Sequence, residues 1–260
     1  MDGGTVASDL DLPSEAFCEL SYREYEFEDP DLEPLQVAQD PSGRLAAGIG
    51  ATVWDAGLSL CKYLESPNCQ DALQGKTWID LGSGTGIVGL VAAQMGARVV
   101  LTDQKIALPL LEVNINSHRD RFPLSPIKLQ MDWKEMAAAS TQESGLGVIE
   151  ELSRLGAWPV DGLLVGDCVW FEELVEPLLT SIMLLADGPP GHETQVILSH
   201  DHGHNSHKPG LDERIFGTID LRLDGALRRV PMEDLNPRWR DDTISVWHGT
   251  LHTRRNNKKK

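Results

Sequence analysis

The stretch Trp78-Ile79-Asp80-Leu81-Gly82-Ser83-Gly84-Thr85-Gly86-Ile87-Val88-Gly89-Leu90 decides the fold of this chain. Residues 77–81 are apolar or β-branched apart from Asp80, as in a strand that is buried on both faces. The three glycines that follow have no Cβ, so the backbone can turn sharply there and approach a ligand closely. Apolar residues then recur at helical spacing until Gly96, where a C-terminal cap is expected. We therefore predict a strand, a glycine turn and a helix, whose free N-terminal amides suit a polar or anionic group.

Predicted strands and helices alternate along the rest of the chain. Further strands are expected at 97–102, 127–131, 162–166 and 195–199, and helices at about 56–65, 87–95, 106–118, 148–155 and 172–186. This alternation predicts an α/β fold with a parallel sheet and helices on both of its faces. Residues 221–230 and 243–247 are strand-like with only a loop between them, so we expect an antiparallel hairpin to finish the sheet.

Two short alternating segments precede the first predicted helix. Residues 21–27 and 35–38 have the alternation of strands, and Asp40-Pro41-Ser42-Gly43 has the composition of a turn, which together predict an N-terminal β ribbon. Residues 1–20 are acidic and poor in aromatic side chains, so we expect them to be mobile. The predicted organisation is a mobile segment at 1–20, one domain at 21–253 and a basic tail at 254–260.

The composition indicates a chain that can bury a substantial core. Hydrophobic residues make up 41% of the 260 positions. No apolar run reaches roughly 18 residues, so no membrane span is expected, and the first residues lack the apolar region of a secretion signal. The four cysteines form no C-x-x-C pair and indicate free thiols in a reducing compartment: Cys18, Cys61, Cys69 and Cys168. We therefore expect a cytoplasmic location.

The chain is strongly acidic, with a formal net charge of −17. This charge disfavours nucleic acid as a ligand and attracts a basic partner. The tail at 254–260 holds five bases and no acids. It is either a nuclear-localisation patch or a solvated chain end. We expect the protein to be a monomer.

Acidic residues lie at or near the carboxyl ends of four predicted strands: Asp80, Asp103, Asp132 and Asp167. In open α/β sheets, ligands bind outside those ends. Asp103 follows Gly82 by 21 residues, about the spacing at which an acid reaches the ribose hydroxyls in a nucleotide site. The aspartates therefore predict a ligand site at one edge of the sheet.

The glycine turn reads G-x-G-x-G rather than G-x-G-x-x-G, so S-adenosylmethionine and a dinucleotide compete as ligands. The glycine spacing and Asp80 favour S-adenosylmethionine, because a carboxylate attracts a cationic amino-acid group rather than a pyrophosphate. A purely structural strand-to-helix turn is the third interpretation, and Asp103 at its expected distance weakens it.

Further candidates each have a plain structural alternative. Asp132-Trp133 is a candidate for adenine contact and Trp54 for the same site, with core packing as the alternative. Asp167 and Trp170 follow the fourth predicted strand. There a carboxylate can orient an amine, and an indole face can hold a cation. The alternative is that Asp167 caps a helix and Trp170 packs in the core. Residues 200–207 are rich in histidine but contain no closed zinc set, so we predict a mobile polar loop and no metal site, with an indirect role in substrate binding left open.

Several of these motifs occur together and in one order: Gly50-x-x-x-Trp54, Asp80-Leu81-Gly82-Ser83-Gly84-Thr85-Gly86-x-x-Gly89, Leu101-Thr102-Asp103, Asn114-x-Asn116, Asp132-Trp133 and Gly166-Asp167-Cys168-Val169-Trp170. They resemble the family 16 methyltransferases, the seven-strand, non-SET protein lysine methyltransferases that include the methyltransferase-like 21 group. The resemblance runs from about residue 24 to about residue 250. The glycine turn marks only the wider superfamily, and the tryptophans and Asp167 narrow the assignment.

The resemblance implies a Rossmann-like sheet of seven strands, mostly parallel, with an antiparallel last strand. It implies S-adenosylmethionine contacts at Trp54, Gly82, Ser83, Gly84, Asp103, Trp133 and Gly166. It also implies that Asp167 and Trp170 shape the channel for the substrate amine. The family has D-x-x-Y or D-x-x-F at this place, so the larger indole of Trp170 would narrow the channel or alter the methylation state.

We therefore predict an S-adenosylmethionine-dependent protein N-methyltransferase that acts on lysine side chains without a metal. The transfer is an in-line displacement at the sulfonium methyl, and Asp167 stabilises the positive charge that develops on nitrogen. One alternative is the same chemistry on protein arginine or histidine or on a small amine. Another is a catalytically silent protein that binds a basic partner. A nicotinamide-dependent dehydrogenase is disfavoured by the missing G-x-G-x-x-G.

Overall fold

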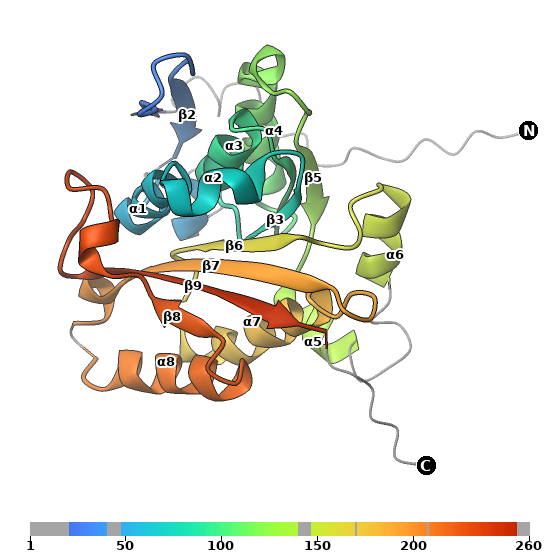
Figure 1. The fold of residues 1–260 in the computed structure, drawn as a ribbon, viewed down its shortest axis with the longest axis vertical. Helices are drawn as coiled ribbons and strands as arrows, with labels where there is room; N and C mark the ends of the chain where they lie inside the picture. Colours follow the sequence, from blue (N-terminus) through green and yellow to red (C-terminus); the bar gives the residue numbers. More distant parts are fainter. Residues whose placement is uncertain (1–20, 41–47, 140–146, 170, 207, 254–260) are drawn as a thin grey trace, which may run out of the picture.

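The computed structural model describes residues 21–40, 48–139, 147–169, 171–206 and 208–253 (Figure 1). The strands are β1 Ser21–Tyr25, β2 Leu35–Gln39, β3 Thr77–Leu81, β4 Arg98–Asp103, β5 Ile127–Gln130, β6 Gly162–Gly166, β7 Glu193–Asp201, β8 Leu227–Arg229 and β9 Ile244–His252. The helices are α1 Asp55–Leu64, α2 Pro67–Leu73, α3 Ile87–Gln94, α4 Leu108–Ser117, α5 Trp133–Ala139, α6 Gly147–Arg154, α7 Glu172–Leu185 and α8 Leu211–Arg222. The short 3-10 helix η5 covers His202–Asn205.

The later strands form one seven-stranded sheet in the order β5-β4-β3-β6-β7-β9-β8, and β1 and β2 form a separate two-stranded sheet. Strands β3 to β7 pair in parallel. Strand β9 lies between β7 and β8 and is antiparallel to both. The mostly parallel sheet, its antiparallel last strand and the antiparallel N-terminal ribbon are therefore confirmed.

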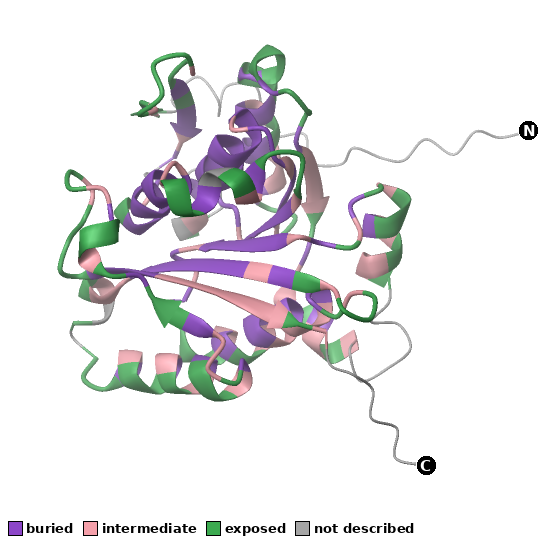
Figure 2. Cartoon of the chain, in the orientation of Figure 1, coloured by how far each residue is buried: buried purple, intermediate pink, exposed green. Residues whose placement is uncertain are grey.

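Helices cover both faces of the large sheet, with α1 to α4 on one side and α5, α7 and α8 on the other (Figure 1). The buried residues lie on the sheet strands and on the inner helices of these layers (Figure 2). Successive residues of a strand pack on opposite faces of the sheet. In β3, Trp78 packs with α1 and α3 and Ile79 packs with α7 and α8. In β6, Leu164 joins the first of these cores and Leu163 the second. Each buried side chain of this size contributes about 1.5–3 kcal/mol, so the two cores hold the carboxyl ends of β3 and β6 in place.

The predicted strand at 221–230 is wrong over its first part. Helix α8 continues to Arg222, and only the three residues of β8 pair with β9. Three buried side chains of α8 recur every four residues: Leu211, Ile215 and Ile219. Leu221 is 80% exposed on the outside of this helix. The apparent strand alternation around Leu221 is therefore the end of an amphipathic helix.

Two short helices are absent from the sequence prediction. Helix α2 begins at Pro67, and α5 fills the start of the connection expected after residue 133. Each has seven residues, and Met136 is the buried residue of α5. A helix of seven residues makes only about two turns, which is too short to show a helical period in the sequence.

Asn114 of α4 fastens the N-terminal ribbon to the glycine turn. Its side-chain oxygen accepts the Ala38 N–H at 2.7 Å, and its side-chain nitrogen donates to the carbonyl oxygens of Ala38 at 3.0 Å and Thr85 at 2.8 Å. Asn114 is fully buried. The β ribbon is thus a support for the turn that follows β3.

Some expectations fall on parts of the chain that the structure does not describe: the mobile segment 1–20, the tail 254–260, the turn at 41–43 and Cys18. The described cysteines, Cys61, Cys69 and Cys168, are free thiols. Within the described ranges, no helix combines the length and the apolar character that crossing a membrane requires.

Candidate functional site

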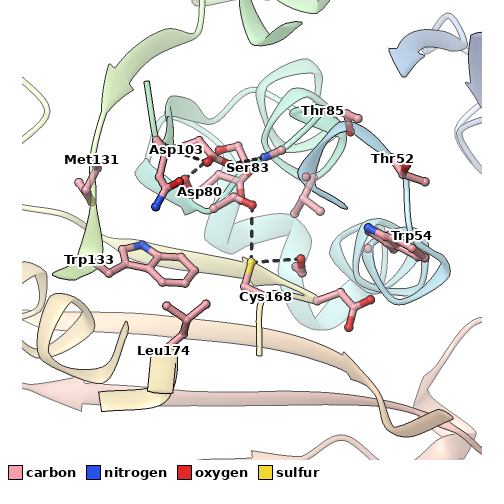
Figure 3. A pocket seen from close by; sticks show the side chains of 18 of the residues that line it. Thr52, Trp54, Asp80, Ser83, Thr85, Asp103, Met131, Trp133, Cys168 and Leu174 are labelled. Carbon is pink, nitrogen blue, oxygen red and sulfur yellow. Dashed lines mark hydrogen bonds between the residues drawn. The ribbon is translucent and has the colours of Figure 1, made fainter. Parts of the chain in front are cut away.

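A pocket opens at the carboxyl-terminal edge of the parallel strands (Figure 3). The turn after β3, the ends of β4 and β6, the start of α5 and the segment before α1 line it. It brings together eight of the nine predicted site residues: Trp54, Gly82, Ser83, Gly84, Asp103, Trp133, Gly166 and Asp167. The ninth, Trp170, lies outside the described residues. The contacts of all nine residues with a ligand stay predictions.

The glycine turn has a backbone that other residues adopt with strain. Gly82 and Gly84 have φ values of 67° and 54°. A Cβ on Gly82 would lie 2.9 Å from the Trp133 ring and 3.0 Å from Cys168 Sγ, inside the pocket. A Cβ on Gly84 would lie 2.4 Å from the Gly50 carbonyl oxygen. Packing as well as ligand access therefore requires these glycines.

Ser83 connects β3 to β4. Its hydroxyl donates to the Asp80 carbonyl oxygen at 2.9 Å and accepts the Thr102 N–H at 2.9 Å. Its own N–H donates to the Thr102 carbonyl oxygen at 2.9 Å. The hydroxyl and the backbone of Ser83 therefore both fix the turn, since its carbonyl oxygen also accepts the Gly86 N–H at 2.7 Å. Its contact with a cofactor stays a prediction.

Asp103, at the end of β4, holds the glycine turn from the neighbouring strand. Its Oδ2 accepts the Gly84 N–H at 2.8 Å, and its Oδ1 accepts the Gln104 N–H at 2.7 Å. Burial raises the pKa of Asp103, and these two hydrogen bonds oppose the rise. A carboxylate has about four lone-pair positions, so it can accept further hydrogen bonds from a ligand in the pocket.

Asp80, in β3, is more deeply buried than Asp103, with 1% of its surface exposed. Its Oδ2 accepts the Gly89 N–H at 3.0 Å, in the first turn of α3, where the helix dipole favours a negative charge. Burial nevertheless raises the pKa of Asp80 to about 7. Asp80 is therefore a buried anchor between strand and helix, although one side of it also lines the pocket.

Trp54 and Trp133 line the pocket from opposite ends (Figure 3). Trp133 begins α5, and Met131 and Leu174 lie at its end of the pocket (Figure 3). Trp54 precedes α1 and forms a T-shaped pair with the His204 ring, with 5.2 Å between the ring centroids. One end of the pocket is thus apolar and the other is bordered by imidazole.

Asp132 has a structural role that the sequence analysis missed. Its Oδ1 accepts the N–H groups of Lys134 at 2.8 Å and Glu135 at 3.2 Å, so it caps the start of α5. Its Oδ2 accepts a hydrogen bond from Gln104 Nε2 at 3.0 Å. The cap sets the position of Trp133, the first residue of that helix.

Asp167 follows β6 and is almost fully buried, with a φ of 53°. Its N–H donates to the Ser199 carbonyl oxygen at 3.0 Å, and its Oδ1 accepts the Asp201 N–H at 3.1 Å. His200 Nδ1 lies 3.7 Å from Oδ1, and His204 Nε2 lies 3.6 Å from Oδ2. Burial raises the pKa of Asp167 to about 6, and the Asp201 N–H and His204 oppose the rise.

The histidine-rich segment is not the polar loop that we predicted. β7 continues to Asp201 and leads directly into η5. His200 is 1% exposed, and burial lowers its pKa. The segment directly follows the predicted strand at 195–199, so it lies at the same edge of the sheet as Asp167. This position was the signal that could have placed His200 and His204 near the site. His207 lies outside the described residues.

Cys168 is a pocket residue to which the sequence analysis gave no role. Its thiol donates to the carbonyl oxygens of Leu81 at 3.2 Å and Gly166 at 3.3 Å. Burial raises its pKa well above the ordinary value, so it is a protonated structural group. Its position directly after Asp167 was the only available signal.

The amino-acid sequence is similar to those of known proteins. A family model described as lysine methyltransferase matches residues 31–211. Protein N-lysine methyltransferase METTL21A of Xenopus tropicalis is 34% identical over 140 residues, which cover 54% of this chain and 56% of that protein. EEF1A lysine methyltransferase 3 of Mus musculus is 45% identical over 84 residues, which cover 32% of this chain and 34% of that protein. The chain spans about half the length of the curated relatives it matches, or less.

A solved structure shows the same fold. The T. thermophilus 16S rRNA N2 G1207 methyltransferase RsmC, in complex with AdoMet and guanosine, aligns with a TM-score of 0.53 at 17% sequence identity. The alignment covers 90% of this chain and 51% of that chain. The expected Rossmann-like methyltransferase sheet is therefore confirmed.

Proposed function

Because this chain belongs to the lysine methyltransferase family, we propose that it is an S-adenosylmethionine-dependent enzyme that methylates lysine side chains of a protein. The observation that carries the proposal is the Asp103 carboxylate, which binds the Gly84 N–H at 2.8 Å inside the pocket. It joins the acid at the end of β4 to the glycine turn after β3, at the sheet edge where α/β folds bind ligands. The names of the relatives and the AdoMet in the T. thermophilus complex support the assignment.

The pocket residues fit the parts of S-adenosylmethionine. The Asp103 carboxylate suits the ribose hydroxyls, and the Trp133 ring with its apolar neighbours suits the adenine. The bare backbone from Gly82 to Gly84, together with Trp54 and Gly166, suits the sulfonium and amino-acid end. When bound, S-adenosylmethionine supplies a methyl group on a positively charged sulfur.

Asp167 is the residue that we assign to the substrate amine. A lysine side chain has a pKa near 10.4, so only about 0.1% or less of it is neutral at pH 7. Desolvation in the pocket favours the neutral amine, whose proton would pass to water. Bound S-adenosylmethionine would supply the methyl group to the amine nitrogen, and the sulfur would leave as a neutral thioether. The Asp167 carboxylate then stabilises the positive charge that develops on nitrogen. Holding the two reactants in line supplies most of the rate.

We assign Trp170 to the wall of the amine channel, on the D-x-x-aromatic pattern alone. Its indole is larger than the tyrosine or phenylalanine of the family pattern, so it would narrow the channel or alter which methylation state is reached. The substrate that we propose has a basic surface, since the chain has a net charge of −17. We also propose a cytoplasmic location, with the tail 254–260 directing part of the protein to the nucleus, and fluorescent fusions with and without the tail test this.

A labelling experiment tests the proposed function. The full chain is incubated with methyl-labelled S-adenosylmethionine and a cell extract, and the labelled protein is identified and hydrolysed. We expect the label in methylated lysine, and about 100-fold less label when Asp167→Asn replaces the wild type. Label in methylarginine or methylhistidine would contradict the lysine assignment. Absence of label together with absence of S-adenosylmethionine binding in calorimetry would contradict the proposed activity itself.

A further inference from the structure

A second cluster of chemically active side chains lies behind Asp167, away from the methyltransferase pocket. It consists of His200 at the end of β7, His202 in η5 and Asp212 in the first turn of α8. His200 Nε2 lies 3.3 Å from Asp212 Oδ1, and His202 Nδ1 lies 2.7 Å from Asp212 Oδ2. One potential ligand atom from each residue lies within 4.8 Å of the other two. The imidazole planes are 88° apart, so the two rings approach from different directions.

The spacing of these atoms fits a single metal ion. Ligand atoms bound to Zn²⁺ at about 2.0–2.1 Å lie roughly 3.3 Å apart in a tetrahedron. The two histidine nitrogens lie 3.3 Å and 2.7 Å from the two oxygens of the Asp212 carboxylate. With one ligand atom from each residue, all three atoms lie within 4.8 Å of one another, close enough to surround one ion. Two imidazole nitrogens and one carboxylate are a common set for divalent transition metals.

One buried atom distinguishes a metal site from a plain hydrogen-bond cluster. A neutral His200 ring that donates from Nε2 to Asp212 has a lone pair at Nδ1, and this lone pair faces Asp167 Oδ1 at 3.7 Å. Among the described residues, His200 Nδ1 is buried without a hydrogen-bond partner. A cation at Nε2 would move the hydrogen to Nδ1, directed at the Asp167 carboxylate. A bound cation would therefore give His200 Nδ1 a hydrogen that it can donate to Asp167 Oδ1, so that two acceptor atoms no longer face each other.

The surroundings also resemble the support that metal-binding histidines receive. His202 Nε2 is 2.8 Å from Ser245 Oγ, which fixes the ring and leaves Nδ1 for a ligand role. The Phe216 ring lies 5.4 Å from both imidazole rings and stacks on Trp247. His202 thus has a hydrogen-bond partner on its far side, and the Phe216 ring packs beside both histidines.

We propose that His200, His202 and Asp212 bind a divalent transition-metal ion, with Zn²⁺ as the best match. The ion joins the end of β7 to the start of α8 and turns the His200 Nδ1–H toward Asp167. The ion does not touch the reacting atoms, and water completes its coordination. Its binding can be tested without the proposed methyltransferase activity.

The test uses the full chain without a polyhistidine tag. Zn²⁺ is titrated into chelator-treated protein by calorimetry, and thermal unfolding is measured with Zn²⁺ and with EDTA. Asp212→Asn and His202→Gln remove ligands while keeping groups that form hydrogen bonds. The matched control is His252→Gln, because His252 is 70% exposed and lies at the far end of β9.

The proposal predicts about one Zn²⁺ per chain in the wild type and in His252→Gln, with affinity lowered at least about tenfold in both ligand variants. A hundredfold excess of Zn²⁺ over its dissociation constant should raise Tm by about 5 °C in the wild type. Co²⁺ in the wild type should give the visible absorption of a four-coordinate site, a readout that needs no variant. Equal Zn²⁺ affinity in all four proteins, or no Tm shift and no Co²⁺ spectrum in the wild type, would overturn the proposal and leave a histidine–aspartate hydrogen-bond cluster.

Discussion

The Asp103 carboxylate holds the glycine turn and faces the pocket at the same time. Asp103→Ala should therefore weaken S-adenosylmethionine binding at least about tenfold, which corresponds to roughly 1.4 kcal/mol. Calorimetry on the full chain measures this loss. Asp71→Ala removes an exposed carboxyl on α2 and should bind like the wild type. An unchanged affinity in Asp103→Ala would remove Asp103 from the cofactor site.

Asp167→Asn is expected to separate chemistry from folding. Asparagine tolerates the left-handed backbone at this position, where φ is 53°, and its side-chain oxygen can still accept the Asp201 N–H. We expect S-adenosylmethionine affinity to stay within about twofold of the wild type while kcat falls about 100-fold or more, as when one transition-state partner is lost. Calorimetry and a methyl-transfer assay give the two numbers. A kcat equal to that of the wild type would exclude the proposed role.

Asp80 should make stability depend on pH. Burial raises its folded-state pKa from the usual 3.8 to about 7. Between these two values the unfolded chain has released the proton that the folded protein keeps, so stability falls as pH rises through this window. Asp80→Asn has no proton to lose, and its stability should fall less than that of the wild type between pH 5 and pH 8, by roughly 2 kcal/mol.

Urea unfolding of both proteins at the two pH values measures the difference. The exposed Asp71 provides the control, since Asp71→Asn should follow the wild-type profile. Parallel profiles for Asp80→Asn and the wild type would mean that Asp80 does not titrate in this range.

At the scale of elements, Asn114 connects α4, β2 and the glycine turn. Asn114→Ala would leave the Ala38 N–H and two carbonyl oxygens without their partner in a buried place. The expected cost is about 3 kcal/mol of unfolding free energy, with weaker S-adenosylmethionine binding because Thr85 belongs to the turn. Urea unfolding and calorimetry measure both effects. Asn116→Ala, on the exposed side of the same helix, should change neither, and equal effects of the two variants would contradict the connection.

Elements whose signal is local could be predicted from the sequence. The strand before Gly82, the glycine turn and the helix after it depend on apolar spacing and on missing Cβ atoms, and the structure has them at 77–81 and 87–94. The prediction of a strand from residue 221 is wrong because the end of α8 alternates like a strand. The buried face of the same helix, Leu211 to Ile219, follows the helix period. Two periods competed there, and packing against the sheet decided between them.

At the scale of the whole molecule, the sheet order decides which distant residues meet. Trp54, Asp103, Trp133 and Asp167 come from segments far apart in sequence, and each could be identified by its own motif. That His200 and His204 approach Asp167 depends on β6 and β7 being neighbours in register, with Gly166 opposite Ser199. No local pattern contains this information, so the sequence of residues 200–207 alone predicts a polar loop rather than a strand end beside Asp167.

The net charge of the molecule, −17, should govern how it meets its substrate. An acidic enzyme attracts a basic protein over distances that salt screens, since the Debye length is about 10 Å at 0.1 M ionic strength. We expect kcat/KM for a basic protein substrate to fall about tenfold between roughly 0.05 M and 0.5 M salt. The KM for S-adenosylmethionine should change little, because its contacts are short-ranged and inside the pocket. A short lysine peptide without net charge is the control, and a protein substrate as insensitive to salt as this peptide would show that recognition does not depend on the acidic surface.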